Sequence, residues 1–166
     1  MKTLLVVRHA KAESGSGAGD FERVLTDEGR RDAWAQGTFL QRAGLPVARV
    51  ATSSAKRAAE TAQCLVETGG LDVPLDEADA LYNASGDGIL TYVRQAPDAA
   101  QSLLVVAHMP GVGELLSLLT TEHGDLACAV PAGTVAAVSL DIHHWADADY
   151  GTGTLTLFWP PLLALA

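Results

Sequence analysis

The sequence predicts an α/β fold with three layers, in which helices cover both faces of a mostly parallel central sheet. Short apolar runs alternate along the chain with segments whose apolar residues recur at helical spacing, a pattern typical of parallel strands joined by crossover helices. The chain has 166 residues, of which 48% are hydrophobic, and this is enough to bury a substantial core. It shows no internal repeat and no domain boundary, so we expect a single domain over residues 1–166.

The first apolar run, Leu4–Val7, predicts a strand that is buried on both faces and that stops on Arg8 and His9. Side chains alternate along a strand, so two neighbours face one ligand only if the chain leaves the extended conformation between them. We therefore expect this strand to end at Arg8. The glycine- and serine-rich stretch at 12–19 then predicts a loop.

Serine, threonine, glycine and proline mark where the later elements begin and end. Thr26 is an expected N-cap, Ser53 or Ser54 a second one and Ser85 a third. The last two strands flank a polar loop and predict an antiparallel pair. In chain order the expected elements are a helix from Thr26 to Gly44, a strand at 47–52, a helix at 55–68, a strand at 71–75, a helix at 85–96, a strand at 102–107, a helix at 111–121, and strands at 135–140 and 154–158.

The acidic character of the chain limits its partners. Its formal net charge is −9, with only 11 lysines and arginines, which argues against nucleic acid and against an anionic membrane surface as partners. No apolar run approaches the length of a membrane span. The two cysteines lack metal spacing, and we see no signal peptide before Arg8. These features lead us to expect a cytoplasmic protein.

Two of the predicted buried strands stop on a histidine, the first on His9 and the strand at 102–107 on His108. The carboxyl ends of parallel strands meet at one edge of a sheet, so both imidazoles are expected in one pocket. Arg57 lies in the first turn of the helix at 55–68, where a cation opposes the helix dipole unless an anion binds there. With Arg8 and Arg23 it would form a guanidinium cluster suited to phosphate.

This set of residues favours phosphoryl transfer over metal chemistry. The arginines would repel a cation, and no third metal ligand accompanies the two histidines, so we expect neither a metal nor a cofactor. In phosphoryl transfer one histidine attacks phosphorus, while the arginines and the second histidine neutralise charge on the phosphoryl oxygens.

The chain resembles the histidine phosphatase superfamily, with its phosphoglycerate-mutase-like fold, and more narrowly the SixA-type phosphohistidine phosphatases. The resemblance rests on four blocks in order, at 8–10, 23–29, 53–62 and 107–112. It implies that His9 is the nucleophile and that His108 is the second histidine of the pocket. It also implies that Arg8, Arg57 and, in this branch, Arg23 contact the phosphoryl group.

The sequence leaves open which residue, if any, acts as the general acid. Many members of the superfamily protonate the leaving group with a glutamate from an inserted lid, and this chain has little room for one. Glu77 and Asp79 are candidates by their place in the sequence, although both also fit simple surface acids. A site without an acid favours a leaving group that departs easily, such as the imidazole of a phosphohistidine.

We therefore expect a phosphatase that forms a covalent phosphohistidine at His9 and acts on protein phosphohistidine, for example on a histidine phosphotransfer domain. A phosphatase of small phosphate esters is the alternative, and it would depend on an acid near Glu77. A non-catalytic phosphate-binding module is a third reading, which the presence of His9 disfavours because binding alone does not require it.

Overall fold

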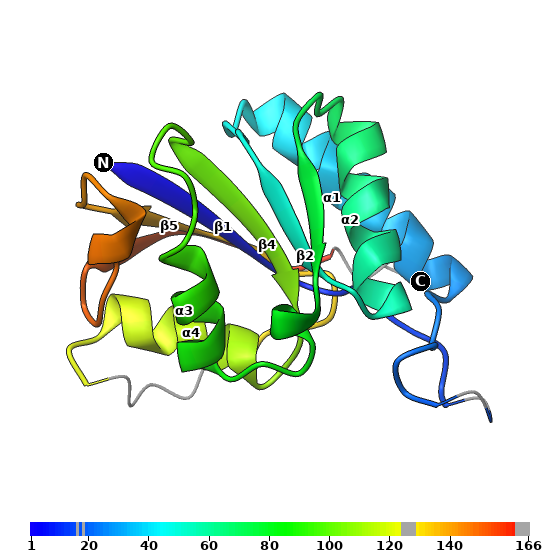
Figure 1. Ribbon diagram of the computed structural model, residues 1–166. Helices are drawn as coiled ribbons and strands as arrows, with labels where there is room; N and C mark the ends of the chain where they lie inside the picture. Colours follow the sequence, from blue (N-terminus) through cyan, green and yellow to red (C-terminus); the bar gives the residue numbers. More distant parts are fainter. Residues whose placement is uncertain (16, 18, 124–128, 162–166) are drawn as a thin grey trace.

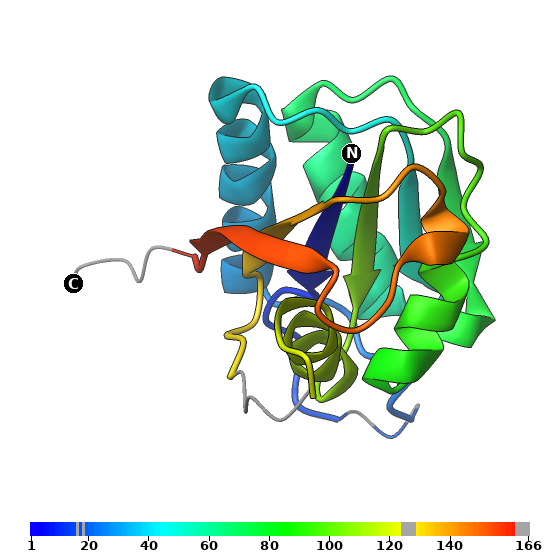
Figure 2. The ribbon, with the colours of Figure 1, turned by 90° about the vertical axis from the view of Figure 1, so that its left-hand side faces the viewer.

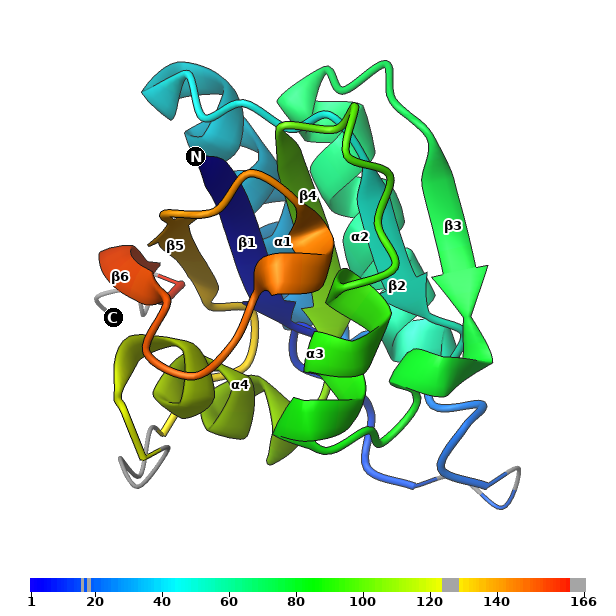
Figure 3. The same ribbon diagram turned by 60° about the vertical axis from the view of Figure 1, so that its left-hand side comes forward.

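A computed structural model of the protein describes residues 1–15, 17, 19–123 and 129–161. Within these residues the strands form one sheet of six, in the order β3-β2-β4-β1-β5-β6 (Figure 3). Strands β1 to β4 run parallel to one another, whereas β5 pairs antiparallel with β1 and with β6. The strands are β1 (Lys2–Arg8), β2 (Val50–Ser53), β3 (Leu75–Ala78), β4 (Ser102–Ala107), β5 (Val135–Leu140) and β6 (Gly153–Trp159).

Helices cover both faces of this sheet, which confirms the predicted three-layer α/β fold (Figure 1). The helices α1 (Asp27–Ala43) and α2 (Lys56–Gly69) pack on one face. The helices α3 (Gly86–Val93) and α4 (Gly111–Thr120) pack on the other, and two 3₁₀ turns lie at 79–81 and 145–147. Among the described residues, no helix has both the length and the apolar character needed to cross a membrane.

Alternate residues of β1 contribute to two separate cores, which explains why its apolar run is continuous. Leu4 and Val6 belong to the core under α3 and α4. Leu5 and Val7 belong to the core under α2. A strand buried on both faces needs apolar residues at every position, as the sequence predicted. Figure 2 shows β5 and β6 continuing the sheet beyond β1, so that β6 is an edge strand.

The predicted third strand was misplaced. The structure places β3 at Leu75–Ala78, whereas the sequence prediction was 71–75. Pro74 has no N–H, but its carbonyl accepts a hydrogen bond from Val50 at 2.9 Å, and the strand begins after it. Because β3 is an edge strand that pairs on one side only, it tolerates acidic residues. These acids break the apolar pattern from which a strand is predicted.

Caps were predicted with mixed success. Thr26 and Ser85 do accept hydrogen bonds from the first turns of α1 and α3. Neither Ser53 nor Ser54 caps α2, however, because Ala55 occupies the N-cap position. The hydroxyl of Ser53 instead contacts His108, and that of Ser54 donates to Asp79. The helices at α3 and α4 also end earlier than predicted, at Val93 and Thr120.

Candidate active site

Histidines 9 and 108 lie side by side at the carboxyl edge of the sheet. In the parallel register of β1 and β4, Arg8 lies opposite Ala107. These are the last residues of the two strands, and a histidine follows each of them. Their ring centroids are 5.1 Å apart. The structure therefore brings together the two imidazoles that the sequence predicted to share one pocket.

The backbone around His9 is held from both sides. Strand β1 ends at Arg8, as expected, and the N–H of His9 donates to the carbonyl of Ala107 at 3.0 Å. On the other side, the N–H of Gly133 donates to the carbonyls of Arg8 and His9, both at 3.1 Å. Gly133 has a φ of +75°, a conformation that favours glycine. These bonds fix the segment from which both side chains project.

The His9 ring is oriented by a main-chain oxygen. Its Nδ1 lies 2.8 Å from the carbonyl oxygen of Ala10, which only accepts hydrogen bonds, so Nδ1 carries the proton. The unprotonated Nε2 then accepts a hydrogen bond from Nε of Arg57 at 3.3 Å. Burial, together with the positive charges of Arg57 and Arg8, lowers the pKa of His9 to about 4, although the bond to Ala10 opposes this shift. The ring is neutral at pH 7, with its Nε2 lone pair facing the arginine.

Arg57 lies in the first turn of α2 and is almost fully buried, with 3% of its surface exposed. Its Nη1 donates to the main-chain oxygen of Asp20 at 2.6 Å, and its Nη2 to the Asp20 carboxylate at 2.9 Å. Thr61 ties this turn to the histidine segment, because its hydroxyl donates to the carbonyl of Arg57 and accepts from the N–H of Ala10. The anion expected at this helix N-terminus is, in the structure, a carboxylate.

Asp20 is a residue of the site that the sequence did not reveal. Its carboxylate accepts from Nη1 of Arg23 and from the hydroxyl of Tyr82, both at 2.9 Å, as well as from Arg57. These donors, Arg23 first, hold the pKa of Asp20 well below its usual range, so it is ionised. The sequence signal was its spacing three residues before Arg23, which suggests a surface ion pair and says nothing of Arg57.

Arg23 reaches the site through Asp20. Besides this ion pair, its Nε donates to the carbonyl of Glu13 at 2.7 Å. Its charge is also one of those that lower the pKa of His9. Arg23 therefore lies at the rim of the arginine cluster. Arg8, by contrast, comes from β1 itself, and its Nη1 donates to the carbonyl of Val130 at 2.7 Å.

The His108 ring is more deeply buried than that of His9, with 2% of the residue exposed. Burial first, and then the charges of His9 and Arg57, lower its pKa to about 3. Its Nε2 lies 2.8 Å from Oγ of Ser53. Among the described residues, Nδ1 of His108 and Nε of Arg8 are buried without a partner. The Nε–H of Arg8 calls for an acceptor, as does Nδ1 of His108 in the tautomer that is protonated there, and phosphoryl oxygens would supply it.

The two candidate acids lie apart from these contacts. Glu77 is exposed on β3, and Asp79 is exposed at the start of the 3₁₀ turn, where it accepts from the hydroxyl of Ser54. No hydrogen bond or ion pair in the described part of the chain joins either acid to the histidines or arginines. Tyr82 is nearer, since its ring meets that of His108 edge-on at 5.6 Å.

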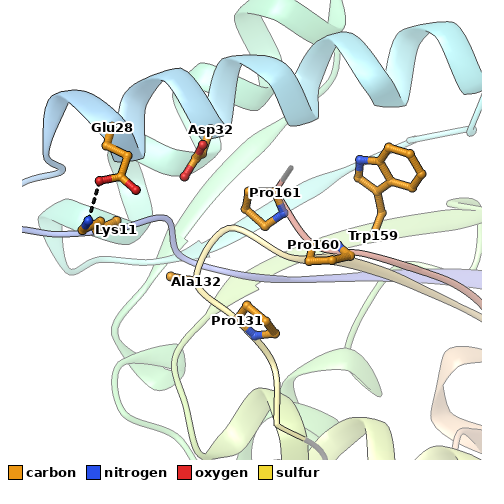
Figure 4. Close-up of a pocket in the computed structure, with 8 residues that line it drawn as sticks. All are labelled: Lys11, Glu28, Asp32, Pro131, Ala132, Trp159, Pro160 and Pro161. Carbon is orange, nitrogen blue, oxygen red and sulfur yellow. Dashed lines mark hydrogen bonds and ion pairs between the residues drawn. The ribbon is translucent and has the colours of Figure 1, made fainter. Parts of the chain in front are cut away.

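A separate pocket of about 530 Å³ lies between the start of α1 and the end of β6 (Figure 4). Its lining is mostly apolar, with an ion pair between Lys11 and Glu28 at its rim. The lining residues are Lys11, Glu28, Asp32, Pro131, Ala132, Trp159, Pro160 and Pro161. It contains no histidine, so it is not the site described above. No group of three or more metal-ligating side chains occurs among the residues that the structure describes.

The chain is similar to proteins of a known family. The model of the histidine phosphatase superfamily (branch 1) matches residues 4–84. A solved structure of a candidate phosphohistidine phosphatase SixA from Nakamurella multipartitia is 31% identical, covers 98% of this chain and 97% of its own, and superposes with a TM-score of 0.83. The chain belongs to the histidine phosphatase superfamily. Its place there is in the SixA-type branch, with the phosphoglycerate-mutase-like fold.

The chain is also similar to two further proteins. An uncharacterized protein of Mycobacterium tuberculosis is 34% identical to this histidine phosphatase over 163 residues, which cover 93% of this chain and 99% of the relative. The structure of the protein histidine phosphatase SixA complexed with tungstate has a TM-score of 0.82 over 96% of this chain and 97% of its own. At 23% identity, that likeness supports the fold alone.

Proposed function

We propose that this histidine phosphatase hydrolyses phosphohistidine on a protein, and that it does so through a covalent intermediate at His9. The observation that carries the proposal is the state of the His9 ring. Its Nδ1 proton is held by the Ala10 carbonyl, and its Nε2 lone pair faces the buried Arg57. A neutral imidazole fixed beside a guanidinium is suited to attack a phosphoryl group that the guanidinium binds.

In the first step the Nε2 lone pair of His9 bonds to phosphorus, and the bond from phosphorus to the leaving imidazole breaks. The electron pair of that bond goes to the leaving nitrogen, whose ring carries a proton on its other nitrogen. Arg8, Arg57 and the rim residue Arg23 neutralise the phosphoryl oxygens, and His108 donates to one of them. In the second step water attacks phosphorus, the bond to Nε2 breaks, and both water protons leave with H₂PO₄⁻. His9 returns to its starting state.

The position of the acids supports this substrate. Phosphate esters need a proton for their leaving alkoxide, and Glu77 and Asp79 lie outside the cluster of contacts around the histidines. Asp20 does touch the cluster, but its low pKa leaves it without a proton to donate. The imidazole of a phosphohistidine that is protonated on its other nitrogen leaves as a neutral ring and needs no such acid. We further propose that residues 1–166 form one histidine-phosphatase domain; the cytoplasmic location remains a prediction.

Turnover on a phosphohistidine-bearing phosphotransfer protein, measured beside a panel of small phosphate esters, tests the proposal. We expect kcat/KM on the phosphohistidine protein to exceed that on every ester. Faster hydrolysis of an ester would instead favour the small-molecule phosphatase. If His9→Ala bound vanadate as the wild type does, and no substrate of either kind were turned over, the chain would be a phosphate-binding module.

A further inference from the structure

The hydroxyl of Ser53 is the polar group that holds the buried ring of His108. Ser53 is the last residue of β2 and is completely buried. Its Oγ lies 2.8 Å from Nε2 of His108. The same Oγ accepts a hydrogen bond from the N–H of Ala55, at 3.3 Å, where the chain turns into α2. The contact therefore links the end of β2 to the residue that follows β4.

The position of the His108 proton depends on the donors and acceptors around Ser53. A serine hydroxyl has one proton to donate, and one of its two lone pairs is taken by Ala55. His108 is neutral near pH 7, because burial lowers its pKa to about 3, so its ring carries one proton. That proton is on Nδ1 if the Ser53 hydroxyl donates to Nε2, and on Nε2 if the ring donates to Ser53.

The two arrangements differ in how many buried groups they leave unpaired. With the proton on Nε2, the hydroxyl proton of Ser53 has no acceptor among the described residues, and the lone pair of Nδ1 has no donor. With the proton on Nδ1, the single unpaired group is the Nδ1–H itself. Because unpaired buried polar groups are costly, the second arrangement is the more stable one.

We propose that Ser53 is a positioning residue that fixes His108 as the Nδ1–H tautomer and thereby turns it into a hydrogen-bond donor for the phosphoryl group. Without this constraint a neutral histidine could equally present a lone pair, which would repel a phosphoryl oxygen. The role of the donor rests on the proposed function. The tautomer and its dependence on Ser53 do not, because both are properties of the protein alone.

The direct test is nitrogen NMR of the His108 ring in ¹⁵N-labelled full-length protein at pH 7. We expect a protonated Nδ1 and an unprotonated Nε2 in the wild type, and loss of this preference in Ser53→Ala. Thr52→Val is the matched control, because the Thr52 hydroxyl is buried in the same strand and donates to the Ser53 carbonyl without touching His108. It should leave the His108 spectrum unchanged.

Kinetics add a second readout. Ser53→Ala should lower kcat by about tenfold, which is less than the loss usually caused by deleting a transition-state donor outright. Ser53→Thr keeps the hydroxyl and should recover both the Nδ1–H spectrum and most of the activity, which a packing defect would not allow. A wild-type His108 protonated on Nε2 would overturn the proposal, even if Ser53→Ala failed to fold. So would an unchanged tautomer in a folded Ser53→Ala.

If the wild-type spectrum is as expected but no phosphohistidine or ester is hydrolysed, the proposed function fails and the assignment of Ser53 stands. If phosphohistidine is hydrolysed but the His108 proton is on Nε2, the function stands and the assignment fails. The two claims are therefore tested separately.

Discussion

Replacing Asp20 by asparagine should strengthen phosphate binding. The Asp20 carboxylate accepts a hydrogen bond from the guanidinium of Arg57, the buried arginine proposed to bind the phosphoryl group. A phosphate that binds Arg57 must therefore compete with an ionised carboxylate and overcome its repulsion. Asp20→Asn removes the charge while keeping the shape and an oxygen acceptor.

The size of the effect follows from the exposure of the pair. The side chain of Asp20 is 47% exposed although that of Arg57 is 4% exposed, so solvent screens the carboxylate considerably. We take about 1 kcal/mol for such a pair, near the upper end for exposed ion pairs. At about 1.4 kcal/mol per factor of ten, the dissociation constant of inorganic phosphate should fall roughly fivefold. Isothermal titration calorimetry at pH 7 and constant ionic strength measures it.

Glu22→Gln is the matched control, because it removes the same charge from the same loop but from an acid that pairs with Lys56. It should change phosphate affinity much less than Asp20→Asn. Equal or weaker phosphate binding by Asp20→Asn would refute the reasoning, since Asp20 would then support the bound phosphate. An equal gain in both variants would show that only the net charge of the loop matters.

The remaining predictions concern pH, the acids and packing. Since His9 must be neutral to attack and its pKa is lowered to about 4, kcat/KM should be flat above about pH 5 and fall about tenfold per pH unit below 4. Because the unfolded chain binds this proton near pH 6.5, the free energy of unfolding should also fall as pH drops from 6.5 to 4, which denaturation at several pH values measures. Glu77→Gln and Asp79→Asn should each keep turnover of protein phosphohistidine within about twofold of wild type, whereas an ester phosphatase would lose most of its turnover. Gly111→Ala would place a Cβ 1.9 Å from the carbonyl oxygen of Ala84, so chemical denaturation should show a loss of about 1–3 kcal/mol.

The parts of the site that lie on buried strands could be predicted from the sequence. The apolar runs before His9 and His108 define β1 and β4, and parallel pairing then brings the histidines together. Arg57 could be recognised because a cation in a first helical turn needs an anion nearby. In these cases the constraint that shapes the local sequence, burial for the strands and the helix dipole for Arg57, also determines where the residue lies in the fold.

The rest depends on long-range contacts that leave no local pattern. Asp20 reaches Arg57 across 37 positions of sequence, and Ser53 reaches His108 across 55. Ser53 in particular has the residue type and place of a helix cap, and only the structure shows that its hydroxyl is used elsewhere. The position of the edge strand β3 was predicted wrongly because an edge strand need not be apolar, so its sequence carries no clear pattern.

Trapping the phosphoenzyme tests the central claim most directly. Wild-type protein would be mixed with a radiolabelled phosphohistidine protein, quenched with alkali on the millisecond timescale, and digested to locate the label. The account predicts an alkali-stable, acid-labile phosphoryl group on His9, and no label in His9→Asn. Label on any other residue, or full turnover by His9→Asn, would contradict it.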